Sequence, residues 1–320
     1  MLFLVIFFYS RKDQELQVIH GFAQGTSYSV SYYASSDRIK KHQIDSILLK
    51  IDSSMSLYKP YSLINQFNKS TQGSQLDGDF LKVVKKSFEI FKATDGRFDI
   101  TVGPLVQLWG FGPRAINVFP DSTLIKETLK HVGMNKLKLQ GQHLKKANPK
   151  VEIDLNGIAQ GYSVDVVAAF LTAQGLNSYM VEIGGEVIAK GYKPDGSGYR
   201  IGIEGPGSEG FRHIIQIKEG AVTTSGNYQK FLSYKKGKIS HLINPQTGYP
   251  LDNSMISVTV YANDAMTADG YDNALMAMDL KAAMAFVKGR KDLEAYFIYR
   301  KPDGSVTDTL TNGFKKLLVN

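Results

Sequence analysis

The chain has 320 residues, of which 43% are hydrophobic and 21% charged, a composition typical of globular proteins that excludes extensive disorder. The formal net charge of +8 suits an anionic ligand, an anionic membrane surface or nucleic acid, and does not choose among them. Cysteine is absent, which excludes disulfides, thiolate nucleophiles, iron–sulfur clusters and cysteine-based zinc sites.

The first nine residues, MLFLVIFFY, are apolar, and a polar and charged cluster (SRKD) follows them at once. Nine residues are too few to cross a bilayer, which takes about 20. The run resembles the hydrophobic part of a secretory signal, although no basic residue precedes it, and an apolar first strand is the alternative. Because such an edge strand would promote aggregation, we expect residues 1–20 to be an export signal or membrane-anchoring leader. Residues 21–320 are then expected to form one domain.

The first predicted elements follow this leader. Residues 26–33 alternate like a strand, and residues 37–50 place isoleucines and leucines at near-helical spacing. Residues 60–80 are polar and are predicted to be a loop. A second amphipathic helix is predicted at residues 81–93, closed by Asp95-Gly96.

In the middle of the chain, residues 113–150 are predicted to form a segment at the periphery of the fold. A strand is predicted at 151–155, and a helix from Ile158 that ends at Gly175. The second half is richer in short β-type runs, predicted at residues 179–183, 199–203, 214–217, 230–234, 238–243 and 256–261.

Helices are predicted at residues 267–278 and 280–288, the second capped by Asp279, and a hairpin at 296–310 closes the chain. Runs of strands with interspersed helices indicate an α+β fold with mixed or antiparallel sheets.

Segment 96–112, GRFDITVGPLVQLWGFG, holds the only tryptophan, Trp109, close to Phe98 and Phe111. Flat aromatic walls and glycines that permit close approach suit a planar heterocycle. The alternative is a core turn filled with aromatic side chains.

Segment 151–161, VEIDLNGIAQG, turns at Asn156-Gly157 into a helix start, where free backbone N–H groups can bind an anion. Asp154 suits a ribose hydroxyl, an adenine amine or a cation. The glycines do not match the G-x-G-x-x-G dinucleotide fingerprint, so the motif alone is weak.

Segment 221–250 contains TTSG at residues 223–226, predicted to be a hydroxyl-rich turn that suits phosphate oxygens. His241 stands at a strand end before Asn244-Pro245 and has the most polar neighbours of the six histidines. A structural or exposed histidine is the alternative.

Segment 264–279, DAMTADGYDNALMAMD, places Asp269 and Asn273 at i and i+4, so on a helix their oxygens converge. Asp264 and Asp272 are expected to face elsewhere. Oxygen-only ligands favour magnesium or calcium over zinc or copper. The alternative is an N-terminal helical turn enriched in aspartate by the helix dipole.

Together the segments resemble the ApbE family of FAD:protein FMN transferases, over a stretch from near Gly25 to Met278. The motifs that carry the resemblance, in the family's order, are GTSYSV, MSLYKPYSLINQFN, GRFDITVGPLVQLWGFGP, DLNGIAQGYSVD, VEIGGEVIAKG, TTSGNYQ, SHLINPQTGYPLDN and SVTVYANDAMTADGYDNAL.

The resemblance implies an α+β domain related to the tunnelling T-fold, with FAD in a cleft. It also implies an exported, magnesium-dependent bacterial enzyme that transfers the FMN half of FAD to a threonine or serine hydroxyl and releases AMP. Implied acceptors are flavin-bearing subunits of membrane redox complexes, of the sodium-translocating NADH:quinone reductase or Rnf type. The implied location is the periplasm, with the leader either cleaved or attached to the inner membrane.

The resemblance assigns the metal to Asp269, Asn273 and the backbone carbonyl of Gly157. Asn273 stands where the family usually has threonine, but an amide carbonyl is still a hard oxygen ligand. His241 matches the histidine proposed for catalysis, with Asp269 as its catalytic companion, and it would take the proton from the acceptor hydroxyl.

The resemblance also assigns residues to FAD. Gln160 replaces the usual lysine, and Gln24 stands where methionine is common. Asn227 and Asn244 replace family aspartates, which removes any acid role there. The residues expected to contact FAD are Gln24, Tyr58, Arg97, Phe98, Asp99, Asp154, Gln160, Thr224, Ser225 and Gly226.

Rival functions are a FAD-binding protein or FAD pyrophosphatase without protein transfer, and a solute-binding protein, which would need neither Asp269 nor His241. A nucleic-acid partner is not expected, because the lysines are scattered and no recognised module appears.

Overall fold

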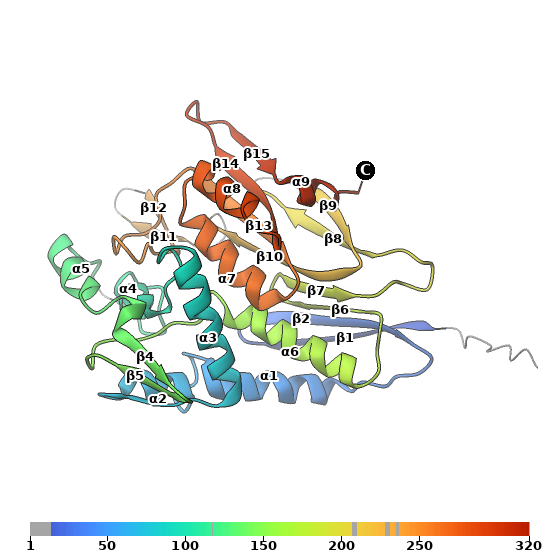
Figure 1. Ribbon diagram of the computed structural model, residues 1–320, viewed down its shortest axis with the longest axis horizontal. Coiled ribbons are helices and arrows are strands. Elements are labelled where there is room, and N and C mark those ends of the chain that lie inside the picture. Colours follow the sequence, from blue (N-terminus) through green and yellow to red (C-terminus); the bar gives the residue numbers. More distant parts are fainter. Residues whose placement is uncertain (1–13, 117, 207–209, 228–230, 235–236, 320) are drawn as a thin grey trace, which may run out of the picture.

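A computed structural model describes residues 14–116, 118–206, 210–227, 231–234 and 237–319. Its centre is an eight-stranded sheet in which every neighbouring pair is antiparallel (Figure 1). In pairing order the strands are β1 (Glu15–Ala23), β2 (Thr26–Ala34), β6 (Tyr179–Ile183), β7 (Glu186–Lys190), β10 (Glu219–Gly226), β13 (Met255–Ala262), β14 (Leu293–Arg300) and β15 (Val306–Leu310). This arrangement confirms the expected α+β class.

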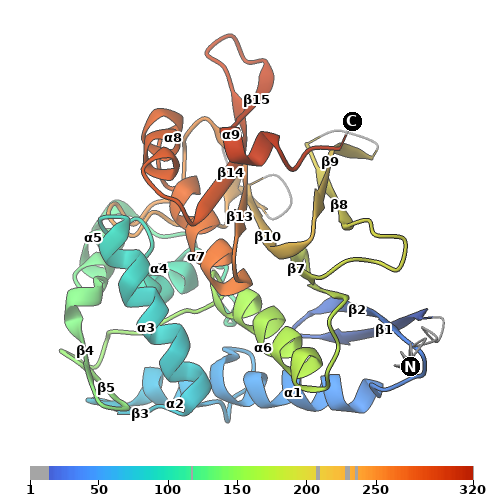
Figure 2. The same ribbon diagram turned by 45° about the vertical axis from the view of Figure 1, so that its right-hand side comes forward.

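Helices cover one face of this sheet (Figure 2). α1 (Lys41–Met55) and α6 (Ala159–Ala173) pack at the β1–β2–β6 end, and α7 (Ala265–Met276) crosses β10 and β13. α3 (Gly78–Ala93) packs against α7, and α8 (Leu280–Lys288) packs against β14. The core between them is apolar and fully buried, as at Phe80, Val258, Leu275 and Phe297.

The opposite face is covered by a separate hairpin of β8 (Tyr199–Glu204) and β9 (Phe211–Ile217), together with α9 (Asn312–Lys315). The Phe314 ring stacks on the Tyr296 ring of β14 with centroids 5.9 Å apart. Val222 of β10 belongs to the same buried cluster, so the middle of the sheet is buried on both faces.

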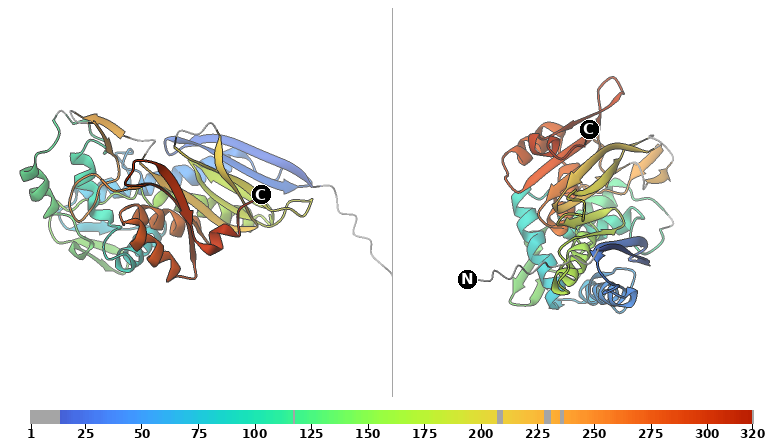
Figure 3. Two further views of the ribbon diagram at one scale, coloured as in Figure 1. Left: turned by 90° about the horizontal axis from the view of Figure 1, so that it is seen from above. Right: turned by 90° about the vertical axis from the view of Figure 1, so that its right-hand side faces the viewer.

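The remaining elements lie toward the end of the molecule opposite β1 (Figure 1). They are α2 (Leu63–Lys69), α4 (Gly103–Leu108), α5 (Ser122–Leu129), the 3₁₀ turns Ile100–Val102 and Met134–Lys136, the small sheet of β3 (Gly73–Gln75), β5 (His143–Lys146) and β4 (Leu137–Gln140), and the hairpin of β11 (Phe231–Tyr234) and β12 (Gly237–Ser240). Figure 3 shows from above that this hairpin and β1 are at opposite ends of the molecule.

Local signals predicted several elements closely. The strand at residues 179–183 is β6 without change, and the final hairpin is β14 and β15. Asp279 caps α8 by accepting a hydrogen bond from the Ala282 N–H over 2.8 Å, as expected.

The polar stretch 60–80 was wrongly predicted to be a loop, because it contains α2 and β3. The polar side chains of this stretch have structural roles. Asn65 donates its side-chain N–H groups to the carbonyl oxygens of Leu57 and Lys59 over 3.0 and 2.8 Å. Ser62 caps the N-terminus of α2 at the Asn65 N–H.

Residues 151–155 belong to no sheet, so the predicted strand is wrong. Hydrogen bonds from side chains and from another loop satisfy the backbone of this segment, as a neighbouring strand would in a sheet. The Asn68 side chain binds the Ile153 N–H and C=O, and the Asp154 N–H donates to the Ile100 carbonyl. The buried Lys146 ammonium donates to the carbonyl oxygens of Asn68, Pro149 and Val151 over 3.0, 3.2 and 3.0 Å.

The expected leader at residues 1–20 overlaps the folded domain. Residues 15–20 belong to β1, which pairs with β2 along its whole length, from Glu15 opposite Ala34 to Ala23 opposite Thr26. The apolar run at residues 1–9 lies outside the described residues. Among the helices of the described chain, none combines the length and the apolar character needed to cross a bilayer.

Candidate active site

The centre of the site is formed by α7. Asp264 caps this helix at the Thr267 N–H, and Asp269 and Asn273 then share one face, as their spacing predicted. The Asp269 side chain is buried and its Oδ2 accepts a hydrogen bond from the Gly161 N–H of α6 over 2.9 Å. A Cβ on Gly161 would collide with the Ala265 carbonyl oxygen, so only glycine lets α6 approach α7 this closely.

The Asn273 amide meets the loop that precedes α6. Its Nδ2 lies 3.4 Å from the Gly157 carbonyl oxygen and 3.3 Å from Asp269 Oδ1. Its Oδ1 accepts a hydrogen bond from Ser225 Oγ over 3.3 Å. The loop before α6 and helix α7 thus bring the expected ligand residues Gly157, Asp269 and Asn273 to one place.

This donor set fits a magnesium ion. The Gly157 carbonyl, the Asp269 carboxylate and the Asn273 amide each contain a hard oxygen, the kind of ligand that Mg²⁺ prefers. Asn273 Oδ1 is turned toward Ser225 here, so the amide would have to rotate to bind the ion. Burial raises the pKa of the Asp269 carboxyl, and a bound cation would offset this cost of ionisation. In the described part of the chain, no cluster of three or more histidine, aspartate or glutamate side chains offers another metal site.

Asp272 was expected to face elsewhere, and this was wrong. Its side chain is 1% exposed and lies inside the site, on the turn of α7 between Asp269 and Asn273. Oδ1 accepts a hydrogen bond from Asn273 Nδ2 over 2.9 Å, and Oδ2 accepts one from Thr223 Oγ1 over 2.6 Å. Burial and then the Asp269 charge raise the pKa of Asp272.

Residues 223–226 form the end of strand β10 and are not the predicted turn. Strand alternation therefore separates neighbouring hydroxyls. Thr223 and Ser225 face α7, whereas Thr224 pairs with Thr259 of β13 over 2.9 Å on the other face. Ser225 is thus brought to the metal ligands and Thr224 is not, and Gly226 ends the strand opposite Ser257.

Asp154 belongs to segment 151–155, and its charge acts on the Tyr58 hydroxyl. Asp154 is buried, and its Oδ1 accepts a hydrogen bond from the Asn156 N–H over 2.8 Å. Burial raises the pKa of the Asp154 carboxyl. Tyr58 is 63% exposed, and partial burial of its hydroxyl, followed by the charge of Asp154, raises its pKa.

The expected flavin-contacting residues 97–99 make internal contacts. Arg97 Nη1 donates to the Ala277 carbonyl oxygen at the end of α7 over 3.2 Å, and the Phe98 ring is buried in the core. Asp99 accepts hydrogen bonds from the Thr101 N–H and hydroxyl and from the Met134 N–H. Burial raises the pKa of Asp99 in spite of these bonds.

Two glutamines tie hairpin turns to α6. Gln24 adopts a left-handed conformation with φ of 55° in the β1–β2 turn and donates to Ser163 Oγ over 2.9 Å. Gln160 donates through Nε2 to the Ile183 carbonyl oxygen and to Glu186 Oε2, over 2.8 and 2.6 Å. Both amides therefore position the N-terminal half of α6 against the sheet.

The His241 loop packs against the aromatic segment 96–112. The His241 ring stands edge-on to the Phe111 ring with centroids 6.2 Å apart, and the Trp109 indole N–H donates to the Gly248 carbonyl oxygen. Asn244 Oδ1 accepts from the N–H groups of Gln246 and Thr247, which closes the turn after His241. Asn227 donates its amide to the Met255 carbonyl oxygen over 2.8 Å.

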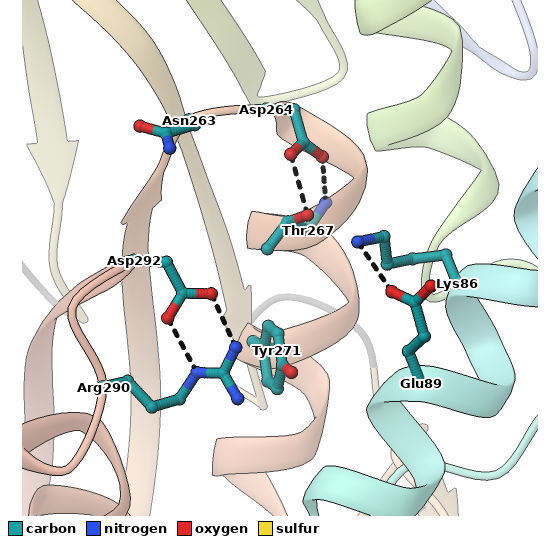
Figure 4. Close-up of a pocket in the computed structure, with 8 residues that line it drawn as sticks. All are labelled: Lys86, Glu89, Asn263, Asp264, Thr267, Tyr271, Arg290 and Asp292. Atoms are coloured by element: carbon teal, nitrogen blue, oxygen red, sulfur yellow. Dashed lines mark hydrogen bonds and ion pairs between the residues drawn. The ribbon is translucent and has the colours of Figure 1, made fainter.

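A separate polar cavity of about 260 Å³ lies on the other side of α7 (Figure 4). Thr267 and Tyr271 line it from the helix face that points away from Asp269. The lysine and the arginine that line the cavity form ion pairs with carboxylates that also line it. Lys86 pairs with Glu89 over 3.0 Å, and Arg290 pairs with Asp292 over 2.6 Å. None of the candidate site residues lines this cavity.

Comparisons with known proteins identify the family of the chain. Residues 24–297 match the ApbE family. The chain is similar to the FAD:protein FMN transferase of Vibrio cholerae, with 35% identity over 316 residues that cover 96% of this chain and 94% of the relative. It is equally similar to that of Haemophilus influenzae, with 35% identity over 324 residues that cover 96% and 93%.

Solved structures give the same result. The flavin transferase ApbE from Vibrio cholerae superposes with a TM-score of 0.87 at 35% identity, covering 95% of this chain and all (100%) of that chain. The flavinyl transferase ApbE of Pseudomonas stutzeri, in its apo form, superposes with a TM-score of 0.86 at 32% identity, covering 95% and 97%. The chain belongs to the ApbE family.

Proposed function

We propose that this chain is a FAD:protein FMN transferase, which moves the FMN half of FAD to a threonine or serine hydroxyl of a target protein and releases AMP. The relatives with this name match nearly the whole chain. The observation that carries the proposal is the meeting of Gly157, Asp269 and Asn273 at one point between α6 and α7. Transfer of a pyrophosphate-linked group needs such a cation site.

Gly157, Asp269 and Asn273 are the residues that would hold Mg²⁺ here. When bound, the ion would supply positive charge to the pyrophosphate of FAD as charge develops on the leaving AMP. Ser225, next to Asn273, adds a hydroxyl on the same side of α7.

His241 is the proposed base. The acceptor hydroxyl oxygen bonds to the phosphorus of FMN, and the bond from that phosphorus to the bridging oxygen breaks, so AMP leaves with the bridging oxygen. The hydroxyl proton passes to the His241 imidazole. Support comes from the loop after His241, which Asn244 and the Trp109–Gly248 hydrogen bond hold in place.

Tyr58 and Asp154 are the best supported of the proposed FAD contacts. The exposed Tyr58 ring offers a stacking surface for a planar heterocycle, and the Asp154 carboxylate, whose charge acts on the Tyr58 hydroxyl, suits a hydroxyl or amine donor. The side chains of Gln24, Asp99 and Gln160 already bind protein groups, so we propose that they shape the FAD site through the backbone that they hold.

We further propose that the acceptors are flavin-bearing subunits of membrane redox complexes, of the sodium-translocating NADH:quinone reductase or Rnf type. Flavinylation in the periplasm requires export, which the apolar run at residues 1–9 supports.

The test is co-expression of this chain with such an acceptor subunit, followed by intact-mass spectrometry of the denatured acceptor. We expect the mass increment of one FMN, and no increment with Asp269→Ala or when the acceptor threonine is replaced by alanine. FAD consumed to FMN and AMP without labelled acceptor would support a FAD pyrophosphatase instead. FAD bound but not consumed would support a FAD-binding protein.

A further inference from the structure

We propose that one face of the β1–β2 hairpin rests on the surface of a lipid bilayer that contains anionic phospholipid. This outer face consists of the β1 side chains Leu16, Val18 and Phe22, which point away from the helices that cover the sheet. The inference goes beyond FMN transfer, because it concerns where the enzyme is held and uses no step of the reaction.

Strand alternation places these three side chains on the face opposite the helices. Ile19 of β1 packs with the buried cluster under α1 and α6. Successive residues of a strand point to opposite faces of the sheet, so Leu16, Val18 and Phe22 point to the other side. Leu16 is paired with Tyr33 of β2, and Tyr33 packs with the cluster that the β8–β9 hairpin covers.

In the described part of the chain, the outer face is apolar and uncovered. Leu16 is 52% exposed, Val18 45% and Phe22 73%. The fourth β1 side chain on this face is His20, which is exposed as well. β1 is the edge strand of the sheet (Figure 2), and its sequence contains neither lysine nor proline. Because an apolar edge of this kind promotes aggregation in water, we expect the face to have a partner.

The sequence before β1 favours a membrane as that partner. Residues 1–9 are apolar, and only residues 10–14 separate them from Glu15, where β1 begins. Even when fully extended, this connection spans at most about 20 Å. An apolar run that enters the bilayer therefore keeps β1 next to the membrane surface. Nine residues are too few to cross the hydrocarbon core, and a weak anchor needs a second contact for stable binding.

Groups that favour a membrane interface lie near the Leu16 end of the outer face. The Tyr33 N–H donates to the Ser178 carbonyl oxygen, and Ser178 Oγ donates to the Tyr192 carbonyl oxygen over 2.6 Å. Tyr192 is exposed, and the Lys218 ammonium lies 4.9 Å from the centre of its ring. Tyrosine prefers the headgroup level of a bilayer, and lysine is attracted to anionic lipid.

The first experiment uses the whole 320-residue chain, which contains no cysteine, so a single introduced cysteine can carry a polarity-sensitive fluorescent probe. The probe is placed at Val18→Cys or Phe22→Cys on the outer face. The control is Leu49→Cys, which is similarly exposed but lies on α1. On addition of phosphatidylethanolamine–phosphatidylglycerol vesicles, the emission of both outer-face probes should shift to shorter wavelengths and be quenched by nitroxide-labelled lipid. The probe at Leu49 should not respond.

The second experiment measures vesicle affinity by flotation. Replacing Val18 and Phe22 together by serine should weaken binding by about tenfold or more, because less apolar surface leaves water. Leu49→Ser removes an exposed apolar side chain from α1 and should bind like the wild type. Lys218→Ser should weaken binding to anionic vesicles by about fivefold and leave binding to phosphatidylcholine vesicles unchanged. Melting temperatures show whether each variant is folded, and the probe measurement serves if the serine variant is not.

Three results would overturn the proposal. The chain could float with vesicles while the probes at Val18 and Phe22 respond no more than the probe at Leu49, so that residues 1–9 alone anchor it. The outer-face probes could respond to protein concentration without vesicles, which would assign the face to a second copy of the chain. The wild type could fail to bind vesicles. None of these results bears on FMN transfer, which the mass of the acceptor tests separately.

Discussion

Trp109 donates its indole N–H to the carbonyl oxygen of Gly248 over 2.8 Å and joins two segments that are 139 residues apart in the chain. The Tyr249 ring packs on the same indole with centroids 6.1 Å apart. This contact links the aromatic segment 96–112 to the loop that follows His241. The position of His241, the proposed base, therefore depends on its packing against segment 96–112.

Replacing Trp109 by phenylalanine should destabilise the protein and slow FMN transfer. The Gly248 carbonyl would lose its donor in a buried place, at a cost of about 1–3 kcal/mol. The melting temperature and single-turnover transfer measure the two effects. Tyr261→Phe is the matched control, because it removes an exposed hydroxyl that donates to the Glu219 carbonyl. An unchanged melting temperature for Trp109→Phe would contradict the structural role.

Removing the His241 imidazole should retain FAD binding but lower FMN transfer by about 10² to 10⁴, the usual contribution of a positioned general base. Single-turnover transfer at saturating FAD measures this for His241→Ala and His241→Gln. Near-native transfer by the glutamine variant would mean that His241 only donates a hydrogen bond to phosphate. His42→Ala, at an exposed position of α1, should transfer at the wild-type rate.

Lys146→Met should destabilise the protein by about 2–4 kcal/mol, because three carbonyl oxygens lose one buried ammonium donor. Burial lowers the pKa of the Lys146 ammonium. The ammonium still donates hydrogen bonds to three carbonyl oxygens. The same change should raise the KM for FAD, since Lys146 supports the segment that carries Asp154. Lys145→Met, at the exposed neighbouring position, is the control for chemical denaturation and for KM. Equal stability of the two variants would disprove the role of Lys146.

Asp165 should make stability depend on pH. Its carboxylate accepts hydrogen bonds from the N–H groups of Ala265 and Met266 at the start of α7. Burial raises the pKa of the Asp165 carboxyl to about 7. The unfolded chain has a pKa of about 3.9 at this group, so the folded state binds a proton more tightly and stability falls as pH rises from about 4 through about 7.

Asp165→Asn lacks this titration. The stability advantage of the wild type over Asp165→Asn should therefore be larger at pH 5 than at pH 8, as melting temperatures at the two values would measure. An advantage that stays constant or grows with pH would contradict the direction of the shift.

Much of the helical geometry of the site could be predicted from the sequence. Asp269 and Asn273 lie on one face of α7 because a spacing of four residues puts them there in any helix. The cap at Asp279 also depends on neighbouring residues only.

Tertiary structure alone decided the rest. Thr224 and Ser225 are adjacent in sequence, but β10 pairs with β13 and turns them to opposite faces, so only Ser225 reaches Asn273. The Asp272 side chain faces the site, where its Oδ2 accepts a hydrogen bond from Thr223, which is 49 positions away in the sequence. Residues 151–155 read as a strand, yet Asn68 and Lys146 satisfy their backbone in place of a neighbouring strand. Periodicity specifies which side of an element a residue takes, but the partner that meets it there depends on contacts between distant parts of the chain.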